Sequence, residues 1–193
     1  MTVKENKSMM MDITKIALID EHSIKHWGVT DEEGRHLGWL ASQVPEGGLI
    51  VEIGTLYGRS TSFIAIGAKK EVRVYAVDCW EGTHYHRMIQ AVEYFTKLDL
   101  MSKIKIIKGY STRVVKSFKG SIDMLYIDGD HSYESVKSDY NAWYPFLVKG
   151  GIIAFHDHIL PKYPGIVKFV AEKPAGENDF IAQVGKVWSG KKK

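Results

Sequence analysis

The chain has few of the residues that build disulfide frameworks, metal–thiolate clusters or membrane spans. Its single cysteine, Cys79, excludes an intramolecular disulfide and a cysteine-based zinc cluster. Residues 1–15 mix charged residues with methionines and contain no continuous apolar run, so we expect neither a signal peptide nor a membrane span there. A cytoplasmic protein with no membrane partner is therefore expected.

An excess of charge of either sign is also missing. Lys and Arg number 26 against 23 Asp and Glu, which gives a net charge of +3. Part of this excess lies in Lys191–Lys193, which we expect to be a solvated tail. No basic stripe interleaves with aromatic residues, so nucleic acid is an unlikely partner. With 193 residues, of which 45% are hydrophobic, the chain fits one globular domain with a substantial core.

From Leu49 onwards, short apolar segments alternate with segments of helical periodicity. The predicted strands are Leu49–Ile53, Val72–Val77, Lys103–Ile107, Ile122–Ile127 and Gly151–Phe155. The predicted helices between them are Ser60–Ala68, Arg87–Leu98, Ser111–Phe118 and Ser132–Leu147. Strand and helix repeated in this way predict an α/β fold with a parallel sheet covered on both faces.

The segments that flank this core are predicted to be shorter additions. Before it, Gly34–Val44 has the apolar spacing of a helix, and residues 1–33 are expected to form an N-terminal arm or cap. After it, Ile166–Glu172 is expected to be helical. Phe180–Val184 and Lys186–Trp188 then predict a closing hairpin around Gly185.

The chain is accordingly divided into an arm, residues 1–33, and one domain, residues 34–193. Within the arm, Met9–Met11 offer an apolar surface on which a second subunit could pack as a homodimer.

The turn after the first predicted strand lacks the glycine spacing that phosphate ligands require. Gly54 and Gly58 are separated by three residues, whereas a dinucleotide turn needs Gly-x-Gly-x-x-Gly, and no Gly-Lys-Ser or Gly-Lys-Thr follows. The carboxylate of Glu52 beside this turn favours a ligand with a positive centre. S-adenosylmethionine has a sulfonium cation and an adenosine but no phosphate, and it fits these properties.

Polar and aromatic residues follow the next two strands. Asp78 ends the second strand and could accept hydrogen bonds from both ribose hydroxyls, while Trp80 could stack on an adenine. Ser111 follows the third strand, where an adenine edge would lie. Taken singly, Asp78 could instead be a helix cap, Trp80 a core residue and Ser111 an N-cap.

A second group of titratable residues follows the fourth and fifth strands. Asp128, Asp130 and His131 follow the fourth strand, and His156 and Asp157 follow the fifth. In an open parallel sheet these strand ends face one crevice. The group could hold a divalent cation that acidifies a substrate hydroxyl, or a histidine could act as a general base without a metal. The structural alternative is that the aspartates cap helices and the histidines are satisfied polar residues. The loop histidines His84 and His86 could close over the pocket.

Four segments together resemble the class I S-adenosylmethionine-dependent methyltransferases, in particular the methyltransferase-24 domain group. These segments are Val51–Thr61, Tyr75–Asp78, Leu125–Glu134 and Gly150–Asp157, and the likeness extends over about residues 34–188. The group is related to the cation-dependent O-methyltransferases. The resemblance implies a Rossmann-like, doubly wound, three-layer α/β/α fold with strand order 3-2-1-4-5-7-6 and an antiparallel seventh strand.

The resemblance also implies roles for individual residues. Cofactor contacts would come from Glu52 at the methionine end, from Gly54, Gly58 and Ser60 at the turn, and from Asp78, Trp80, Ser111 and Asp130 at the ribose, adenine and amino groups. Asp128 matches the first metal-binding aspartate of the cation-dependent relatives. His156 and Asp157 occupy the positions where those relatives have Asp followed by Asp or Asn. A metal site of Asp128, His156 and Asp157 would hold Mg²⁺ or another divalent cation, although Mg²⁺ prefers oxygen ligands.

The function expected from these observations is methyl transfer from S-adenosylmethionine to an oxygen of a small hydroxylated substrate. Asp128, His131 and His156 form the expected catalytic set, in which a histidine or a metal-bound hydroxyl provides deprotonation. Two alternatives stay open at this point: a nucleotide-cofactor oxidoreductase on a similar sheet, and a non-catalytic binding protein that retains the fold.

Overall fold

The computed structural model describes Lys15 and residues 28–193. Most of the expected N-terminal arm, including Met9–Met11 and their predicted contact with a second subunit, lies outside the described residues. None of the helices that the structure does describe combines the length and apolarity needed to cross a bilayer.

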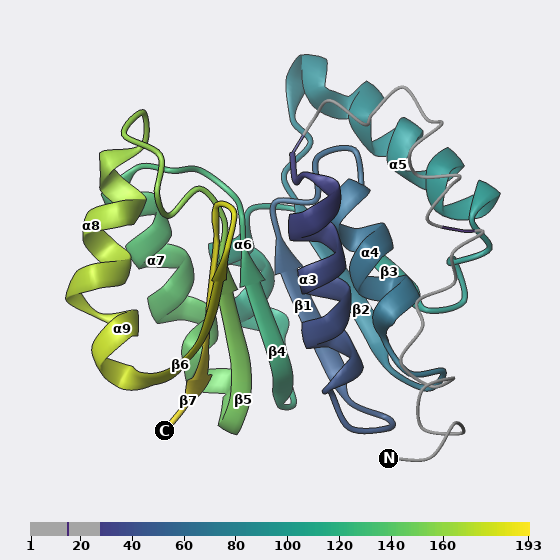
Figure 1. Cartoon of the computed structure of the whole chain (residues 1–193). Helices are drawn as coiled ribbons and strands as arrows, with labels where there is room; N and C mark the ends of the chain where they lie inside the picture. Colours follow the sequence, from purple (N-terminus) through teal and green to yellow (C-terminus); the bar gives the residue numbers. More distant parts are fainter. Residues whose placement is uncertain (1–14, 16–27) are drawn as a thin grey trace.

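Seven strands form a single mixed sheet in the order β3-β2-β1-β4-β5-β7-β6 (Figure 1). Their bounds are β1 Leu49–Ile53, β2 Arg73–Asp78, β3 Ile104–Lys108, β4 Ile122–Ile127, β5 Leu147–Phe155, β6 Asn178–Val184 and β7 Val187–Lys192. Strands β1 to β5 pair in parallel, and β7 pairs antiparallel with both β5 and β6. The expected fold class, strand order and closing hairpin are confirmed.

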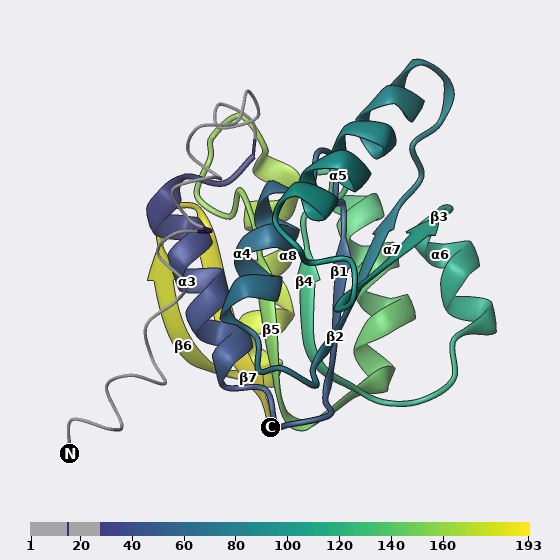
Figure 2. The same ribbon diagram turned by 90° about the vertical axis from the view of Figure 1, so that its right-hand side faces the viewer.

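Helices cover both faces of the sheet, as the two views show (Figures 1 and 2). One face carries α3 (Asp31–Ser42), α4 (Arg59–Gly67) and α5 (Tyr85–Lys97), and the other carries α7 (Tyr133–Trp143) and α8 (Pro164–Glu172). Two short helices, α6 (Ser111–Val114) and α9 (Pro174–Glu177), follow β3 and α8. Neighbouring strand residues such as Ile50 and Val51 are both fully buried but belong to different core clusters. The central strands are therefore apolar throughout because both of their faces are covered.

The predicted helix Ser132–Leu147 is too long at its C-terminal end. Helix α7 ends at Trp143, a short 3-10 turn follows at Tyr144–Phe146, and Leu147 already begins β5. Proline at position 145 favours this break because it has no backbone N–H to continue the helix. Leu147 still packs in the same apolar cluster as Trp143. The helical spacing of buried residues therefore continues to Leu147, although the helix itself ends at Trp143.

Helix α3 begins at Asp31, three residues before the predicted start at Gly34. A capping box explains the earlier start, since the Thr30 side chain accepts from the Glu33 backbone and the Glu33 carboxylate accepts from the Thr30 backbone, at 3.3 and 2.8 Å. The proposed division between residues 33 and 34 consequently lies inside this helix.

The C-terminal lysines do not form the expected solvated tail. Lys191 and Lys192 belong to β7, and the Lys192 ammonium donates to the carbonyls of Tyr144 and Leu147 at 3.0 and 2.8 Å. Lys192 therefore satisfies two carbonyls around the 3-10 turn between α7 and β5.

Candidate functional site

The turn between β1 and α4 depends on glycine at residue 54. Gly54 has φ +93°, and a Cβ placed there would lie 2.0 Å from the backbone carbonyl oxygen of Asp128. Strands β1 and β4 therefore approach each other too closely for any other residue. Gly58, also at positive φ, is the N-cap of α4 and packs against the Phe95 ring instead of lining the cavity described below.

Glu52 lies beneath this turn and is fully buried. Ser60 donates to one carboxylate oxygen at 2.5 Å, and Thr61 donates to the other. Burial raises the pKa of Glu52 to about 7, despite these hydrogen bonds, which lower it. Glu52 does not line the cavity, so the expected direct contact with the methionine end of the cofactor is not supported. The carboxylate instead holds the first turn of α4 against β1.

Asp78 ends β2 and lines the cavity, as expected. Its carboxylate accepts from the backbone N–H groups of Leu56 and Trp80, at 2.8 and 3.0 Å. Both of these residues have positive φ, an uncommon conformation for residues other than glycine that is found at ligand sites. One carboxylate therefore fixes two strained turns.

Trp80 is 1% exposed, and its indole N–H donates to the Leu56 carbonyl at 2.9 Å. It is absent from the cavity lining, so the structure offers no support for the expected stacking on adenine. Its positive φ of 38° accompanies this inward position. Trp80 supports the turn from behind, which is the core role that the sequence left open.

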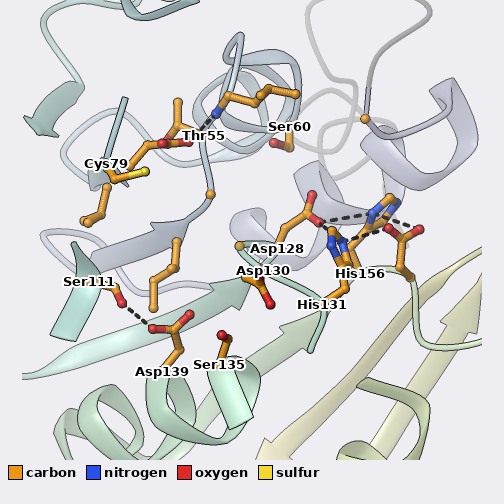
Figure 3. Close-up of a pocket in the computed structure, with 18 of the residues that line it drawn as sticks. Thr55, Ser60, Cys79, Ser111, Asp128, Asp130, His131, Ser135, Asp139 and His156 are labelled. Atoms are coloured by element: carbon orange, nitrogen blue, oxygen red, sulfur yellow. Dashed lines mark hydrogen bonds and ion pairs between the residues drawn. The ribbon is translucent and has the colours of Figure 1, made fainter. Parts of the chain in front are cut away.

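The end of the cavity between β3 and α7 contains a residue that the sequence analysis missed. The Ser111 hydroxyl donates to one oxygen of Asp139, and both residues line the cavity (Figure 3). Asp139 comes from α7 and is 8% exposed, and burial raises its pKa. Its position opposite Ser111 depends on how α7 packs, so no local motif signals it. Asp130 also lines the cavity and accepts from the Ser132 backbone at 2.7 Å, where α7 begins.

The ends of β4 and β5 bring four predicted titratable residues together (Figure 3). His131 Nε2 lies 2.9 Å from Asp157 Oδ2 and 3.5 Å from Asp128 Oδ1. His156 Nδ1 lies 3.3 Å from Asp128 and 3.4 Å from Asp157. The predicted convergence of these strand ends is confirmed.

Glu33 joins this cluster from α3, which the sequence analysis did not foresee. Its carboxylate lies 3.3 Å from His156 Nε2 and accepts from the Lys186 backbone N–H at 2.8 Å. These contacts lower the pKa of Glu33 to about 2, although burial by itself raises it. The capping-box spacing Thr30-x-x-Glu33 could have indicated the cap, but not the contact with a residue 123 positions away.

The two histidines of the cluster differ in accessibility. His156 is 2% exposed and enclosed by Glu33, Asp128 and Asp157, and these carboxylates raise its pKa to about 11 against the effect of burial. The His131 side chain is 25% exposed and stacks on Tyr163 at 4.3 Å between ring centroids. Its two aspartate partners raise its pKa to about 9, although burial lowers it. Both histidines border the cavity described below, and His131 is the more exposed of the two.

The donor set suits a divalent cation, with one change from the prediction. One ligand atom each of Asp128, His131 and Asp157 lie within 4.8 Å of one another. His131 therefore replaces His156, whose two ring nitrogens both face carboxylates. Two carboxylates and one imidazole suit Mn²⁺ or a later transition ion at least as well as Mg²⁺.

A cavity of about 880 Å³ connects these groups. Of the predicted residues, Gly54, Ser60, Asp78, Ser111, Asp128, Asp130, His131, His156 and Asp157 line it, whereas Glu52, Gly58 and Trp80 do not. Its volume lies within the range of small-molecule sites. His84 also lines it, but His86 does not.

Solved structures of known methyltransferases have the same fold as this chain. The O-methyltransferase TomG of Streptomyces achromogenes, involved in tomaymycin synthesis and solved with S-adenosylmethionine, aligns over 100% of this chain and 91% of its own, with a TM-score of 0.69 and 16% identity. An O-methyltransferase of Bacillus cereus, solved with S-adenosylhomocysteine, aligns over 96% and 91%, with a TM-score of 0.67 and 17% identity. The fold is that of class I S-adenosylmethionine-dependent methyltransferases.

The sequence identifies the family more narrowly. The methyltransferase-24 family model, described as a methyltransferase domain, matches residues 51–158, and the chain belongs to this family. An uncharacterized protein of Acanthamoeba polyphaga mimivirus is 32% identical over 139 residues, which is 66% of this chain. The chain spans 61% of that relative's length. Membership of a methyltransferase family argues against the oxidoreductase alternative.

Proposed function

We propose that the protein transfers a methyl group from S-adenosylmethionine to an oxygen atom of a small hydroxylated substrate. One observation carries this proposal: the Gly54 turn, Asp78 and the Asp128–His131–Asp157 cluster all line a single cavity. The two O-methyltransferases of the same fold, solved with the methyl donor or its product, support it.

The residues at the turn and at the ends of β2 and β3 would hold the methyl donor, which supplies an electrophilic methyl group on its sulfonium. The Asp78 carboxylate already accepts two backbone N–H groups, but each of its oxygens has a further lone pair for a ribose hydroxyl. The backbone of the Gly54 turn would lie against the donor because no side chain intervenes. Catalysis then comes mainly from alignment of the acceptor oxygen with the bond that breaks.

Asp128, His131 and Asp157 would hold the divalent cation, which lowers the pKa of an acceptor hydroxyl when it is bound. His156 lies behind this donor set, and its contacts with both aspartates fix the orientation of their carboxylates. Glu33 in turn holds His156 from α3.

Without a cation, deprotonation of the acceptor would pass to His131, because its ring borders the cavity. A pKa of about 9 keeps this ring protonated at neutral pH, so it could accept a proton only in alkaline solution. Turnover by this second route should rise as the pH approaches 9, whereas turnover with a cation should already be present at neutral pH.

The test measures transfer of labelled methyl from S-adenosylmethionine to a panel of small phenols and sugars, with Mn²⁺, Mg²⁺ or a chelator. Asp157→Asn removes a charge but keeps a residue that tolerates the positive φ of 54° at this position. We expect this variant and the chelator each to reduce turnover about 10- to 100-fold or more. Binding of S-adenosylhomocysteine by calorimetry should remain within a few-fold. Asp179→Asn, at an exposed position on β6, is the matched control.

Two results would overturn the proposal in different ways. A chain that binds neither S-adenosylmethionine nor S-adenosylhomocysteine is not a methyltransferase, and tight NADH binding would then revive the oxidoreductase alternative. If the Asp157→Asn variant binds the donor and retains full turnover, catalysis does not depend on the Asp128–His131–Asp157 cluster.

A further inference from the structure

The cavity has two ends, which Figure 3 shows on opposite sides of the pocket. The Ser111–Asp139 pair lies at one end, and Asp128 and His131 lie at the other. We call the second end, which is lined by Asp128, His131 and Asp157, the acceptor end, because the proposed function places the hydroxyl of the substrate there. Two lysines also line the cavity, and their contacts place both of them at the acceptor end.

The first of these lysines, Lys162, is connected to the acceptor end by ring contacts. Its ammonium lies 5.1 Å from the centre of the Tyr163 ring, and the same ring stacks on the His131 imidazole with 4.3 Å between ring centroids. Lys162 is exposed, and no carboxylate of the described residues lies within ion-pair distance of its ammonium. The described part of the chain therefore leaves this positive charge unneutralised at the cavity wall.

The backbone fixes the segment that carries Lys162. A Cβ placed at Gly165, in the first turn of α8, would lie 2.4 Å from the backbone nitrogen of Tyr133 and 2.9 Å from the carbonyl oxygen of His131. The start of α8 is therefore in direct backbone contact with the start of α7. Tyr163 is the N-cap residue of α8 and is held against His131 by this contact. Lys162, the preceding residue, consequently extends from a defined position beside the cluster.

The second lysine, Lys186, lies in the turn between β6 and β7. Its backbone N–H donates to the Glu33 carboxylate at 2.8 Å, and its ammonium lies 3.3 Å from Asp157 Oδ1. Asp157 also lies 2.9 Å from His131 and 3.4 Å from His156. One carboxylate thus divides its contacts among three cationic or basic groups, so Lys186 also has charge to offer to a ligand.

We propose that the methyl acceptor carries an anionic group, a carboxylate or a phosphate, and that Lys162 binds this group with Lys186 as a second partner. This inference rests on the proposed function, because it names the substrate class of the same site. An ammonium at a cavity wall attracts anions, and its N–H groups form charge-assisted hydrogen bonds with carboxylate or phosphate oxygens. Since Lys162 and His131 both contact the Tyr163 ring, one small molecule can reach the lysine with its anionic group and the acceptor end with its hydroxyl.

The test compares pairs of hydroxylated compounds that differ mainly in charge. Protocatechuate is paired with its amide to test a carboxylate, and glucose 6-phosphate is paired with glucose to test a phosphate. Their dissociation constants are measured by calorimetry on the full chain saturated with S-adenosylhomocysteine, with a chelator present so that no metal ion binds the anion directly. The anionic member of at least one pair should bind about 5- to 50-fold more tightly than the neutral member. The pair that shows the preference identifies the anion.

Substitutions of Lys162 separate its role from the general charge of the surface. Lys162→Gln should reduce the preference at least about 3-fold, and Lys162→Glu should abolish or reverse it. Lys168→Gln is the matched control, because the Lys168 ammonium lies 5.2 Å from the Tyr133 ring in a similar contact, but Lys168 does not line the cavity. This control should retain the full preference. The neutral members should bind to all of these variants within about 2-fold of the unaltered chain, because they have no charge for the lysine to attract.

Several results would overturn this inference while leaving methyl transfer intact. They are equal binding of both members in both pairs, a preference that survives Lys162→Glu, and a preference that Lys168→Gln loses to the same extent. Binding of no member of either pair by a chain that binds S-adenosylhomocysteine also overturns it. Failure of the unaltered chain to bind S-adenosylhomocysteine refutes the proposed function itself.

Discussion

Glu52→Gln should make the protein more stable at alkaline pH while leaving its stability at acidic pH nearly unchanged. Glu52 is fully buried beneath the glycine turn, and its oxygens accept from the hydroxyls of Ser60 and Thr61. Glutamine has the same shape, and the two hydroxyls can rotate to donate to its carbonyl or to accept from its amide. The substitution therefore removes mainly the charge.

The magnitude follows from the pKa of Glu52. Burial raises this pKa from 4.5 to about 7, so between these pH values the folded chain binds a proton that the unfolded chain releases. The free energy of unfolding consequently falls as the pH rises through this window. A tenfold change in an acid dissociation constant corresponds to about 1.4 kcal/mol, so the total loss above pH 7 is about 3 kcal/mol. Glutamine has no proton to lose and escapes this penalty.

The assay is urea unfolding of both proteins between about pH 5 and pH 8, with a chelator present so that no cation changes the field of Asp128. The difference in unfolding free energy, variant minus unaltered chain, should increase by about 2.5 kcal/mol across this range, because part of the total loss has already occurred at pH 5. Glu71→Gln, at an exposed loop position, is the control and should show no such increase. A difference that stays constant with pH would show that Glu52 is ionised throughout, and the burial argument would be wrong.

Three further predictions concern the turn and the cluster. Gly54→Ala should destabilise the fold by more than about 2 kcal/mol and weaken binding of S-adenosylhomocysteine, because its Cβ would overlap the Asp128 carbonyl. Thermal melting and calorimetry test this prediction, and an unchanged melting temperature would contradict it. Trp80→Phe should cost about 1 kcal/mol in urea unfolding through the lost indole hydrogen bond. Glu33→Gln should lower the free energy of unfolding by about 3 kcal/mol near neutral pH, because the pKa of Glu33 is lowered from 4.5 to about 2 in the folded chain. This difference should vanish as the pH falls from 4.5 towards 2. A loss of stability that does not depend on pH would refute the ion-pair explanation.

Most of the sheet was predictable because its signals are local. Apolar runs that end at glycine or aspartate give β1, β2 and β4, and the alternation with helices gives the parallel order. The boundary between α7 and β5 was not predictable from periodicity, because Leu147 is buried against the same cluster whether it lies in a helix or a strand. Periodicity predicts which residues are buried, but here it does not predict whether a buried residue lies in a helix or in a strand.

The convergence of the candidate site was predictable for a different reason. The carboxyl ends of parallel strands share one edge of the sheet, so Asp78, Asp128 and Asp157 had to face a common crevice once the strands were assigned. The direction of each side chain was not fixed in this way. Trp80 turns inward at a positive φ, and Glu52 is enclosed by hydroxyls of α4, so neither reaches the cavity.

The fold class, the glycine turn and the set of acidic strand ends could all be predicted from the sequence, because each depends on neighbouring residues or on the shared edge of a parallel sheet. The contacts between the side chains of the site became known from the folded arrangement alone. Glu33 meets His156, Ser111 meets Asp139, and His131 takes the place expected for His156 between two aspartates. Apart from the local pair of His131 with Asp128, these contacts join residues at least 26 positions apart, and packing of the helices and strand ends sets them. No local pattern specifies how that packing aligns one side chain with another.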